Sequence, residues 1–506
     1  MNKVWLTALA TAWLAGFQVK AEALKPDDLQ GTRPNMVFVI TDDNSFDTVG
    51  RYGGGALSPH LDKLYDQSLR LNRFHVSPTC APSRASLMTG RHEFYAGVTH
   101  TIYGRDRMNL ELLTLPQMLR DNGYTTAMFG KWHLGDEKPY RPYQRGFDEV
   151  WQHGAGGIGQ SWPNSADFPA NTYHDPIVLH NETPIQTKGY CSDIFFDKAI
   201  EWIKQNKESG KPFFAYIVPN APHSPHIPPL GYEDRFGSKA TSYEKMQANI
   251  DDNVGKIIQF LDDNGLREDT LLVFYTDNGR SHQTVHGTKL KGGKGSSYEG
   301  GLWVPCLVSW PKHLPGNVDR GELCGHIDWF ETLADLAGAK VAPPGTNPWD
   351  GRSLLPVLCG EADEGWDQRL IIGHRGRWEN GARGQSQYKN VSIQNGKFKL
   401  YDHRELYDMR EDLGETKNIA AHYPEVVAML QKEYDQFWAD ATTYMINDAH
   451  PLPSQELKNE PFHQLYLKEF GPASYAERVE EMNDWKKGGQ SEKEFLESLN
   501  DPQRKM

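Results

Sequence analysis

The sequence predicts an α/β protein with a large, mostly parallel sheet flanked by helices. Four apolar, β-branched runs recur along the chain, and polar or glycine-containing loops follow them. Near-continuous apolar runs of this length are typical of strands that are buried on both faces. Helical stretches lie between the runs, and this alternation favours parallel pairing of the strands. The four runs are 36–40, 125–129, 213–218 and 271–275.

Two of the intervening segments have clear helical patterns, 193–206 and 243–263. In the second, apolar residues recur every three or four positions, at Met246, Ile250, Val254, Ile257 and Leu261. After about residue 370 the pattern changes to short alternating segments over 388–393, 397–401 and 406–408, followed by a helix expected over 424–440. This change predicts a smaller C-terminal α+β subdomain that contains a short antiparallel sheet. The charged end, 474–506, predicts a surface helix with a loose terminus.

Length and composition set the domain organisation. A chain of 506 residues is too long for one simple core, so one large domain plus a smaller one is expected. We predict a signal peptide over 1–23, a catalytic α/β domain over 24–370, the antiparallel-sheet subdomain over 371–445 and an extension over 446–506. The formal net charge of −13 argues against a nucleic-acid partner, which requires a basic face.

The first residues have the pattern of an export signal. A short positive start that ends at Lys3 precedes an apolar stretch over 4–17, and Ala21-Glu22-Ala23 has the small-x-small form of a cleavage site. We therefore expect a periplasmic or secreted protein that is cleaved near Ala23. No later run of about 18 apolar residues predicts a transmembrane segment.

Polar side chains follow each of the four predicted strands. In open α/β sheets, ligands bind beyond the carboxyl ends of the strands. Taken alone, each of these residues fits an ordinary turn, loop or surface position. Together they predict one site at this edge of the sheet, formed by Asp42, Asp43, Lys131, His133, His223, Asp277 and Asn278.

The most specific segment surrounds Cys80, one of five cysteines. Five are too few for a disulfide scaffold, and an odd number leaves at least one unpaired; the pairing of Cys191, Cys306, Cys324 and Cys359 stays open. Pro82 fits the first position of a helix and Gly90 fits its end. Cys80 would then lie at the positive end of that helix, which favours an anion, and Arg84 lies one turn further along.

The segment Cys80-x-Pro82-Ser83-Arg84 with Thr89-Gly90-Arg91 resembles the signature of the type I, formylglycine-dependent sulfatases of the alkaline phosphatase superfamily. The resemblance runs from about residue 34 to 440, and within that family it points toward bacterial exported arylsulfatase-like and polysaccharide sulfatases. It implies an alkaline-phosphatase-like fold. It also implies that a dedicated formylglycine-generating maturation enzyme oxidises Cys80 to 3-oxoalanine. The other shared segments are Gly130-Lys131-x-His133, Pro222-His223-x-Pro225, Asp277-Asn278-Gly279 and 293–301.

The resemblance also implies roles for single residues. The metal ligands would be Asp42, Asp43, Asp277, Asn278 and the modified Cys80. These are oxygen donors, which suit Ca²⁺ first and Mg²⁺ second. The residues around the sulfate would be Arg84, Lys131, His133, His223 and Lys294. We expect His223, assisted by Lys294, to protonate the leaving alcohol, and His133 to remove the remaining hydroxyl proton of the hydrated aldehyde.

The sequence says less about the substrate. Export and an acidic surface favour a sulfated polysaccharide or its oligosaccharides, with exo or endo action left open. The candidate subsite residues beyond the sulfate are Trp162, His153, His374 and Arg375. Three alternatives remain: an arylsulfatase of small aryl sulfates, a phosphodiester or phosphonate-ester hydrolase of the same superfamily, and an inactive glycan-binding homologue. A cysteine peptidase that uses Cys80 with His223 is a further alternative. It is disfavoured because nothing before Cys80 resembles a peptidase signature.

Overall fold

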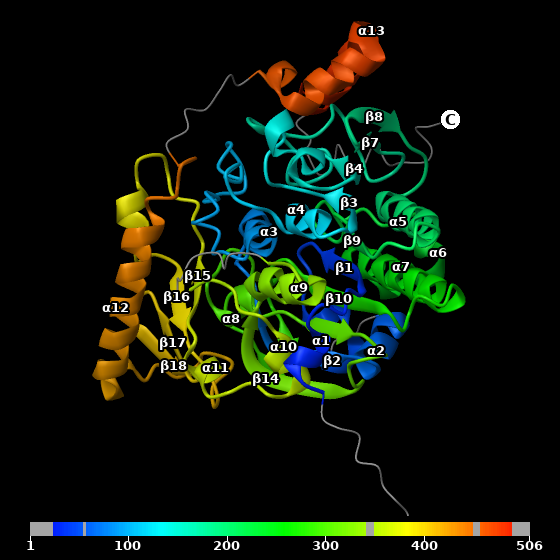
Figure 1. The fold of residues 1–506 in the computed structure, drawn as a ribbon. Coiled ribbons are helices and arrows are strands. Elements are labelled where there is room, and N and C mark those ends of the chain that lie inside the picture. The colour runs from blue at the N-terminus through cyan, green and yellow to red at the C-terminus, as the bar shows by residue number, and fades with distance from the viewer. Residues whose placement is uncertain (1–23, 54–56, 341–348, 449–455, 488–506) are drawn as a thin grey trace, which may run out of the picture.

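A ten-stranded mixed sheet forms the centre of the molecule, a computed structural model that describes residues 24–53, 57–340, 349–448 and 456–487, with side chains to 480 (Figure 1). The order of the strands across the sheet is β14-β2-β13-β10-β1-β9-β3-β4-β7-β8. In that order their bounds are Val318–Gly325, Leu69–His75, Cys306–Ser309, Thr270–Thr276, Asn35–Thr41, Phe213–Val218, Thr125–Lys131, Glu149–His153, Ile177–His180 and Thr183–Gln186.

The middle of this sheet is parallel, as predicted. Strand β1 pairs in parallel with β10 on one side and β9 on the other, and the parallel pairing continues to β3 and β4. The four predicted strands are these central neighbours, β1, β3, β9 and β10, each within one or two residues of the expected bounds. The antiparallel neighbours β13, β7 and β8 were not predicted, because their short runs lack a distinctive pattern.

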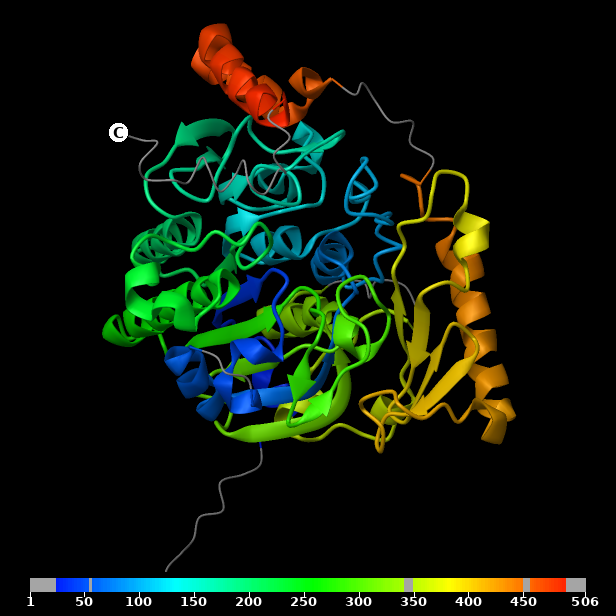
Figure 2. The ribbon, with the colours of Figure 1, turned by 180° about the vertical axis from the view of Figure 1, so that it is seen from behind.

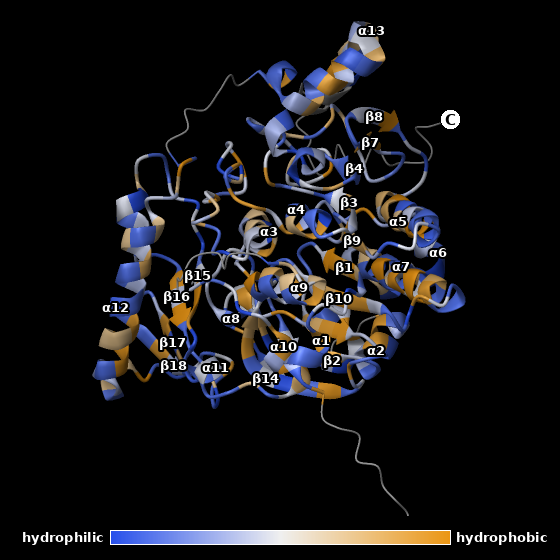
Figure 3. Ribbon diagram, in the orientation of Figure 1, coloured by the Kyte–Doolittle hydropathy of each residue, from blue (hydrophilic) through white to orange (hydrophobic). Residues whose placement is uncertain are grey.

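Helices cover both faces because alternate residues of each central strand point to opposite sides. In β1, Met36, Phe38 and Ile40 join one buried cluster, and Val37 and Val39 join another. The first cluster includes residues of α3 (Cys80–Thr89), α4 (Leu115–Asp121), α9 (Trp329–Ala337) and α10 (Leu355–Cys359), and the second includes residues of α2 (Pro59–Asp66), α5 (Cys191–Lys207) and α7 (Ser242–Asp263). Figure 3 shows the apolar strands between these two helical layers.

The two helices predicted between the strands are confirmed as α5 and α7. Helix α7 begins one residue before the predicted start, and Thr241 caps it by accepting a hydrogen bond from the Glu244 backbone N–H. Helix α3 begins at Cys80 itself, so Pro82 occupies its third position rather than the predicted first. The first turn of a helix needs no N–H at that position, so proline is tolerated there. The end at Gly90 is confirmed, with a left-handed φ of 66°.

A four-stranded antiparallel sheet forms the C-terminal subdomain, as predicted. Its strands pair in chain order, and α12 (Pro424–Ala441) covers one face of it (Figures 1 and 2). Leu430, Tyr434 and Phe437 of α12 are buried in the core between helix and sheet. The first strand was not predicted, and the second starts three residues later than expected. The strands are β15 (Ile371–His374), β16 (Val391–Gln394), β17 (Phe398–Tyr401) and β18 (Glu405–Asp408).

Helix α13 (Pro461–Lys487) lies against β8 and the small hairpin strand β6 (Ser165–Ala166), at the top of Figure 1. It begins well before the predicted surface helix because Phe462 and Tyr466 are buried against Phe168 and Ile177. The predicted signal peptide and residues 488–506 lie outside the described residues, and the predicted domain boundaries remain predictions. Of the helices described, none is long and apolar enough to cross a membrane.

The remaining short helices are α1 (Pro26–Leu29), α6 (Tyr232–Phe236), α8 (Glu299–Leu302) and α11 (Gly365–Gln368), and the remaining strands are β5 (Ser161–Trp162), β11 (Thr284–Val285) and β12 (Thr288–Lys289).

Candidate active site

The carboxyl ends of β1, β3, β9 and β10 bring their polar side chains to one place. Asp42 follows β1 and is fully buried, and its Oδ2 lies 2.5 Å from the Nζ of Lys131, the last residue of β3. Asp277, which follows β10, donates its backbone N–H to the Thr41 carbonyl of β1. Neighbouring parallel strands therefore fix the relative positions of these acids.

A second ion pair joins β1 to a loop that comes much later in the chain. The Nζ of Lys294 lies 2.6 and 2.7 Å from the two carboxylate oxygens of Asp43. Asn278 donates a hydrogen bond from Nδ2 to Asp43 Oδ1 at 2.9 Å. Burial raises the pKa of Asp43, but Lys294 and His223 outweigh it, so that the pKa is well below its usual range. Asp43 is therefore an anion at every physiological pH.

Arg84 binds Asp277, the third acid of the site. Its Nε and Nη2 donate to Asp277 Oδ2 at 3.1 and 2.8 Å, and its Nη1 donates to the Lys131 carbonyl at 2.6 Å. Arg84 is four residues after Cys80 in α3, so one helical turn places the guanidinium beside the thiol. Burial raises the pKa of the Cys80 thiol, but Lys131 and Lys294 together lower it below its usual value.

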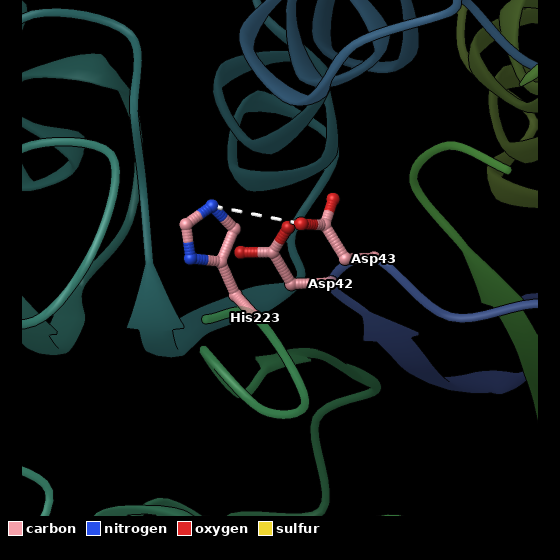
Figure 4. Close-up of side chains that lie close together, drawn as sticks. All are labelled: Asp42, Asp43 and His223. Atoms are coloured by element: carbon pink, nitrogen blue, oxygen red, sulfur yellow. Dashed lines mark ion pairs between the residues drawn. The ribbon is translucent and has the colours of Figure 1, made fainter. Parts of the chain in front are cut away.

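Two histidines lie at this site with different hydrogen bonds. His133 is buried, and its Nε2 lies 2.7 Å from the Thr101 carbonyl, which makes Nε2–H the donor and leaves Nδ1 without a partner among the described residues. His223 is partly exposed; its Nδ1 lies 2.7 Å from the Ser224 carbonyl and its Nε2 lies 3.7 Å from Asp43 Oδ2. Figure 4 shows the imidazole of His223 turned toward Asp43.

The backbone around these side chains is tightly constrained. Asp43 and His133 have left-handed φ angles of 58° and 64°, which residues with a side chain rarely adopt. A Cβ at Gly156 would lie 2.5 Å from the imidazole of His133, and one at Gly157 would lie 3.6 Å from that of His223. The glycine-rich loop over 154–159 therefore packs directly against both histidines. A side chain at Gly156 would displace His133.

Comparison with known protein families shows the family to which this chain belongs. The family model described as Sulfatase matches residues 34–339, and the model described as N-sulphoglucosamine sulphohydrolase, C-terminal, matches residues 293–440. The chain belongs to the sulfatase family. The first match includes every metal and catalytic residue predicted above, and the second includes the antiparallel sheet and α12.

The chain is similar to known members of this family, and it spans only about half to two thirds of the length of the two curated relatives that follow. It is 29% identical to mouse arylsulfatase J over 324 residues, which is 61% of this chain and 53% of that protein. It is 31% identical to human N-acetylgalactosamine-6-sulfatase over 353 residues, 64% of this chain and 66% of that one. The crystal structure of Ps i-CgsB in complex with k-i-k-neocarrahexaose superposes with a TM-score of 0.71 at 25% identity, covering 84% of this chain and 100% of that chain.

The candidate site has the donors that a divalent cation requires. Donor atoms of Asp42, Cys80 and Asp277 lie within 4.8 Å of one another, as do those of Asp42, Asp43 and His223. Among the described residues, the buried Oδ1 atoms of Asp42 and Asn278 accept no hydrogen bond. Burial and the neighbouring carboxylate of Asp42 raise the pKa of Asp277. Crowded carboxylates with unused oxygens fit a hard cation bound between them.

The four predicted subsite residues lie in different surroundings. His374 is buried in the C-terminal core; its Nε2 lies 3.1 Å from the Ser386 carbonyl and its Nδ1 accepts the Gly376 N–H, so its position does not support contact with substrate. His153 is buried in the sheet beside Lys131, which makes it a neighbour of the site rather than part of its surface. Trp162 is half exposed on a hairpin, and Arg375 is exposed beside Gly295.

Two residues that fix the site through hydrogen bonds, Thr101 and Asn390, were not predicted from the sequence. The Thr101 carbonyl orients His133, and Asn390 binds the Lys294 loop by donating to the Gly295 carbonyl and accepting from the Ser297 backbone N–H. Thr101 acts through its backbone, which carries no residue-specific signal. Asn390 acts across 95 residues of sequence, so no local pattern reveals it.

Proposed function

We propose that this protein hydrolyses sulfate esters of carbohydrates, using an aldehyde made from Cys80 and a bound calcium ion. The observation that carries the proposal is the placement of Cys80. Its sulfur lies within 4.8 Å of donor oxygens of Asp42 and Asp277, at the first position of α3 and close enough to Lys131 and Lys294 for their charges to lower its pKa. A helix N-terminus with two ammonium groups favours an anionic group at this point.

The ligands of the metal would be Asp42, Asp43, Asp277, Asn278 and the oxygen of the modified Cys80. When bound, the cation supplies Lewis-acid stabilisation of negative charge, and the hydrated aldehyde supplies a nucleophilic hydroxyl. The three carboxylates are already balanced by Arg84, Lys131 and Lys294. A divalent cation would therefore leave the site with positive charge, which suits an anionic ester.

The hydrogen bonds of the two histidines support the proposed proton-transfer roles. The Nδ1 of His223 is engaged by the Ser224 carbonyl and its Nε2 lies 3.7 Å from Asp43 Oδ2, so Nε2 is the nitrogen positioned to pass a proton to the leaving alcohol. His133 has only Nδ1 free to accept a proton. Burial and the charge of Lys131 hold the pKa of His133 well below its usual value, which keeps the ring neutral and able to act as the base. Lys131 and Lys294 hold the transferred group's oxygens.

The carbohydrate part of the proposal rests on relatives. Human N-acetylgalactosamine-6-sulfatase is named for a sulfated sugar, and Ps i-CgsB was crystallised with neocarrahexaose. Both names support a sulfated polysaccharide or oligosaccharide as the substrate of this chain. On the signal-peptide pattern, we further propose that residues 1–23 direct export to the periplasm or beyond, and that a formylglycine-generating enzyme is the maturation partner.

The first test measures the modification and the reaction together. We expect mass spectrometry of the peptide spanning residues 73–84 to find an aldehyde at position 80, and the purified protein to hydrolyse an aryl sulfate faster than the matched aryl phosphate. A faster phosphate reaction would instead support the phosphodiester or phosphonate-ester alternative. A panel of sulfated glycans that is left intact, beside good turnover of aryl sulfates, would overturn the carbohydrate proposal.

Removal of the metal is the second test. After treatment with a chelator we expect loss of turnover and a lower unfolding temperature, since a ligand at a hundred times its Kd stabilises the folded state by about 2.7 kcal/mol. Calcium should restore both properties better than magnesium. Asp277→Asn should abolish the response to added calcium. The exposed Asp197→Asn is the control, because Asp197 only pairs with Lys256 on the surface. Full activity in chelator would contradict a metal-dependent mechanism.

A further inference from the structure

Two arginines of the C-terminal subdomain border the site, in the loop that follows β15. Gly376 lies between them with a left-handed φ of 63°, and a Cβ there would lie 2.4 Å from the Thr99 carbonyl. The Arg377 backbone N–H also donates to that carbonyl at 2.8 Å. The Arg375-Gly376-Arg377 loop is thus packed against the segment 99–101, so its position relative to the catalytic domain is fixed.

Each arginine lies next to a different residue that borders the catalytic groups. Arg377 Nη2 donates to Thr101 Oγ1 at 2.8 Å, and the carbonyl of the same Thr101 holds His133. The Nε of Arg375 would lie 3.8 Å from a Cβ at Gly295, the residue after Lys294. Burial lowers the pKa of Arg377. The neighbouring Arg375 also lowers this pKa, whereas Cys80 raises it. The Arg375-Gly376-Arg377 loop therefore lies beside the segment that holds His133 and beside the loop that carries Lys294.

Neither positive charge is paired with a carboxylate of the described residues. Within the described part of the chain, no carboxylate lies within the 4.0 Å of an ion pair from Arg375 or Arg377, and the buried Nε of Arg377 has no partner. The contrast with nearby cations is clear, since Arg84, Lys131 and Lys294 each pair with a site acid and Arg105 lies 3.0 Å from Asp448. Unpaired guanidinium groups with free donors are suited to bind carboxylate or sulfate.

We propose that Arg375 and Arg377 form a second anion subsite, which binds a carboxylate or sulfate on the sugar next to the ester that is cleaved. The inference rests on the proposed function, because it places the reacting sulfate at Cys80. It narrows the substrate class to saccharides that carry at least two anionic groups on one or adjacent rings. It also gives the C-terminal subdomain a role in selecting the substrate.

The test compares two ligands in a Cys80→Ala background, where binding is measured without turnover. Galactose 6-sulfate carries one anion, and an unsaturated chondroitin 6-sulfate disaccharide carries a sulfate and a carboxylate. We expect the disaccharide to bind more tightly by calorimetry, and Arg375→Gln to weaken it by on the order of tenfold while changing galactose 6-sulfate by less than about twofold. Arg377→Gln should have the same selective effect.

Arg404→Gln is the matched control, because Arg404 is exposed and lies 3.8 Å from Asp402 in a different loop of the same subdomain. Unfolding temperatures report whether each variant is folded, and Arg375 is the safer position since its guanidinium is exposed. Equal weakening of both ligands, no weakening, or no preference for the disaccharide would overturn the subsite. Failure of the proposed function is separate, because it would appear as absent aryl sulfate hydrolysis by the protein with Cys80 intact.

Discussion

The Cys80→Ala variant is expected to lose at least about a thousandfold in kcat, the scale on which removal of a covalent nucleophile acts. Cys80 is 2% exposed at the first position of α3, and every residue of that helix is buried. The two serines of this helix, Ser83 and Ser86, donate their hydroxyls to the Ser77 carbonyl and to Glu93 instead. Cys80→Ser should be equally slow in turnover, because a serine can accept the sulfuryl group but lacks the second hydroxyl that releases it.

The comparison requires a cysteine whose loss should not matter. Cys359→Ala is the matched control, since Cys359 ends α10, is partly exposed and unpaired, and lies outside the predicted site. Aryl sulfate turnover and unfolding temperature are measured for all four proteins. Small changes in unfolding temperature would show that the Cys80 variants remain folded. Near-normal turnover by either purified Cys80 variant would refute the assignment of the nucleophile.

Cys80, Arg84 and Lys294 were recognised from family motifs, whereas the other predicted site residues share one property: each lies at the end of a strongly apolar strand or just after it. Asp42 and Asp277 come directly after β1 and β10, so recognising the strands was enough to place the two acids side by side. The same reasoning placed Lys131 at the end of β3. Parallel strands align their carboxyl ends, and this turns a one-dimensional pattern into a three-dimensional position.

The parts that could not be predicted depend on contacts between distant segments. His374 was expected near the substrate because it precedes a basic loop, but the short strand β15 turns its ring into an aromatic core with Phe94, Trp378 and Trp438. Strand β15 has only four residues, too few for its alternation to be recognised. Arg377 belongs to the same candidate segment, 374–378, but no pattern singled it out beside Arg375.

The most consequential unpredicted contact joins the two sheets through buried charge. Lys399 of β17 is fully buried, and its Nζ lies 2.6 Å from Glu299 Oε1 and 2.8 Å from Glu415 Oε1. Glu299 begins α8, five residues after Lys294, and its Oε2 lies 2.9 Å from His75 Nε2 at the end of β2. Burial raises the pKa of Glu299, but Lys399 and His75 outweigh it and lower that pKa below its usual range.

Lys399→Met is therefore expected to destabilise the folded protein by about 3–5 kcal/mol, the cost of leaving a buried charge without its partner. Burial already raises the pKa of Glu415 to about 7 with Lys399 present. Loss of the ammonium raises the pKa of Glu415 further and removes the strongest influence that lowers the pKa of Glu299. Because folded pKa values above the unfolded value stabilise only at low pH, the loss should grow as pH rises from about 4.5 to beyond 7. Urea unfolding at pH 5 and pH 8 measures it.

Two further variants separate charge from packing. Lys397→Met, two residues away, should change stability by less than about 0.5 kcal/mol, because Lys397 is half exposed and lies 3.8 Å from Asp408. The triple variant Glu299→Gln, Lys399→Met, Glu415→Gln removes all three charges and should recover much of the stability, since neutral groups of similar volume are often tolerated at such sites. If Lys399→Met and Lys397→Met were equally stable at pH 8, the buried charges would not be what joins the C-terminal sheet to the loop that carries Lys294.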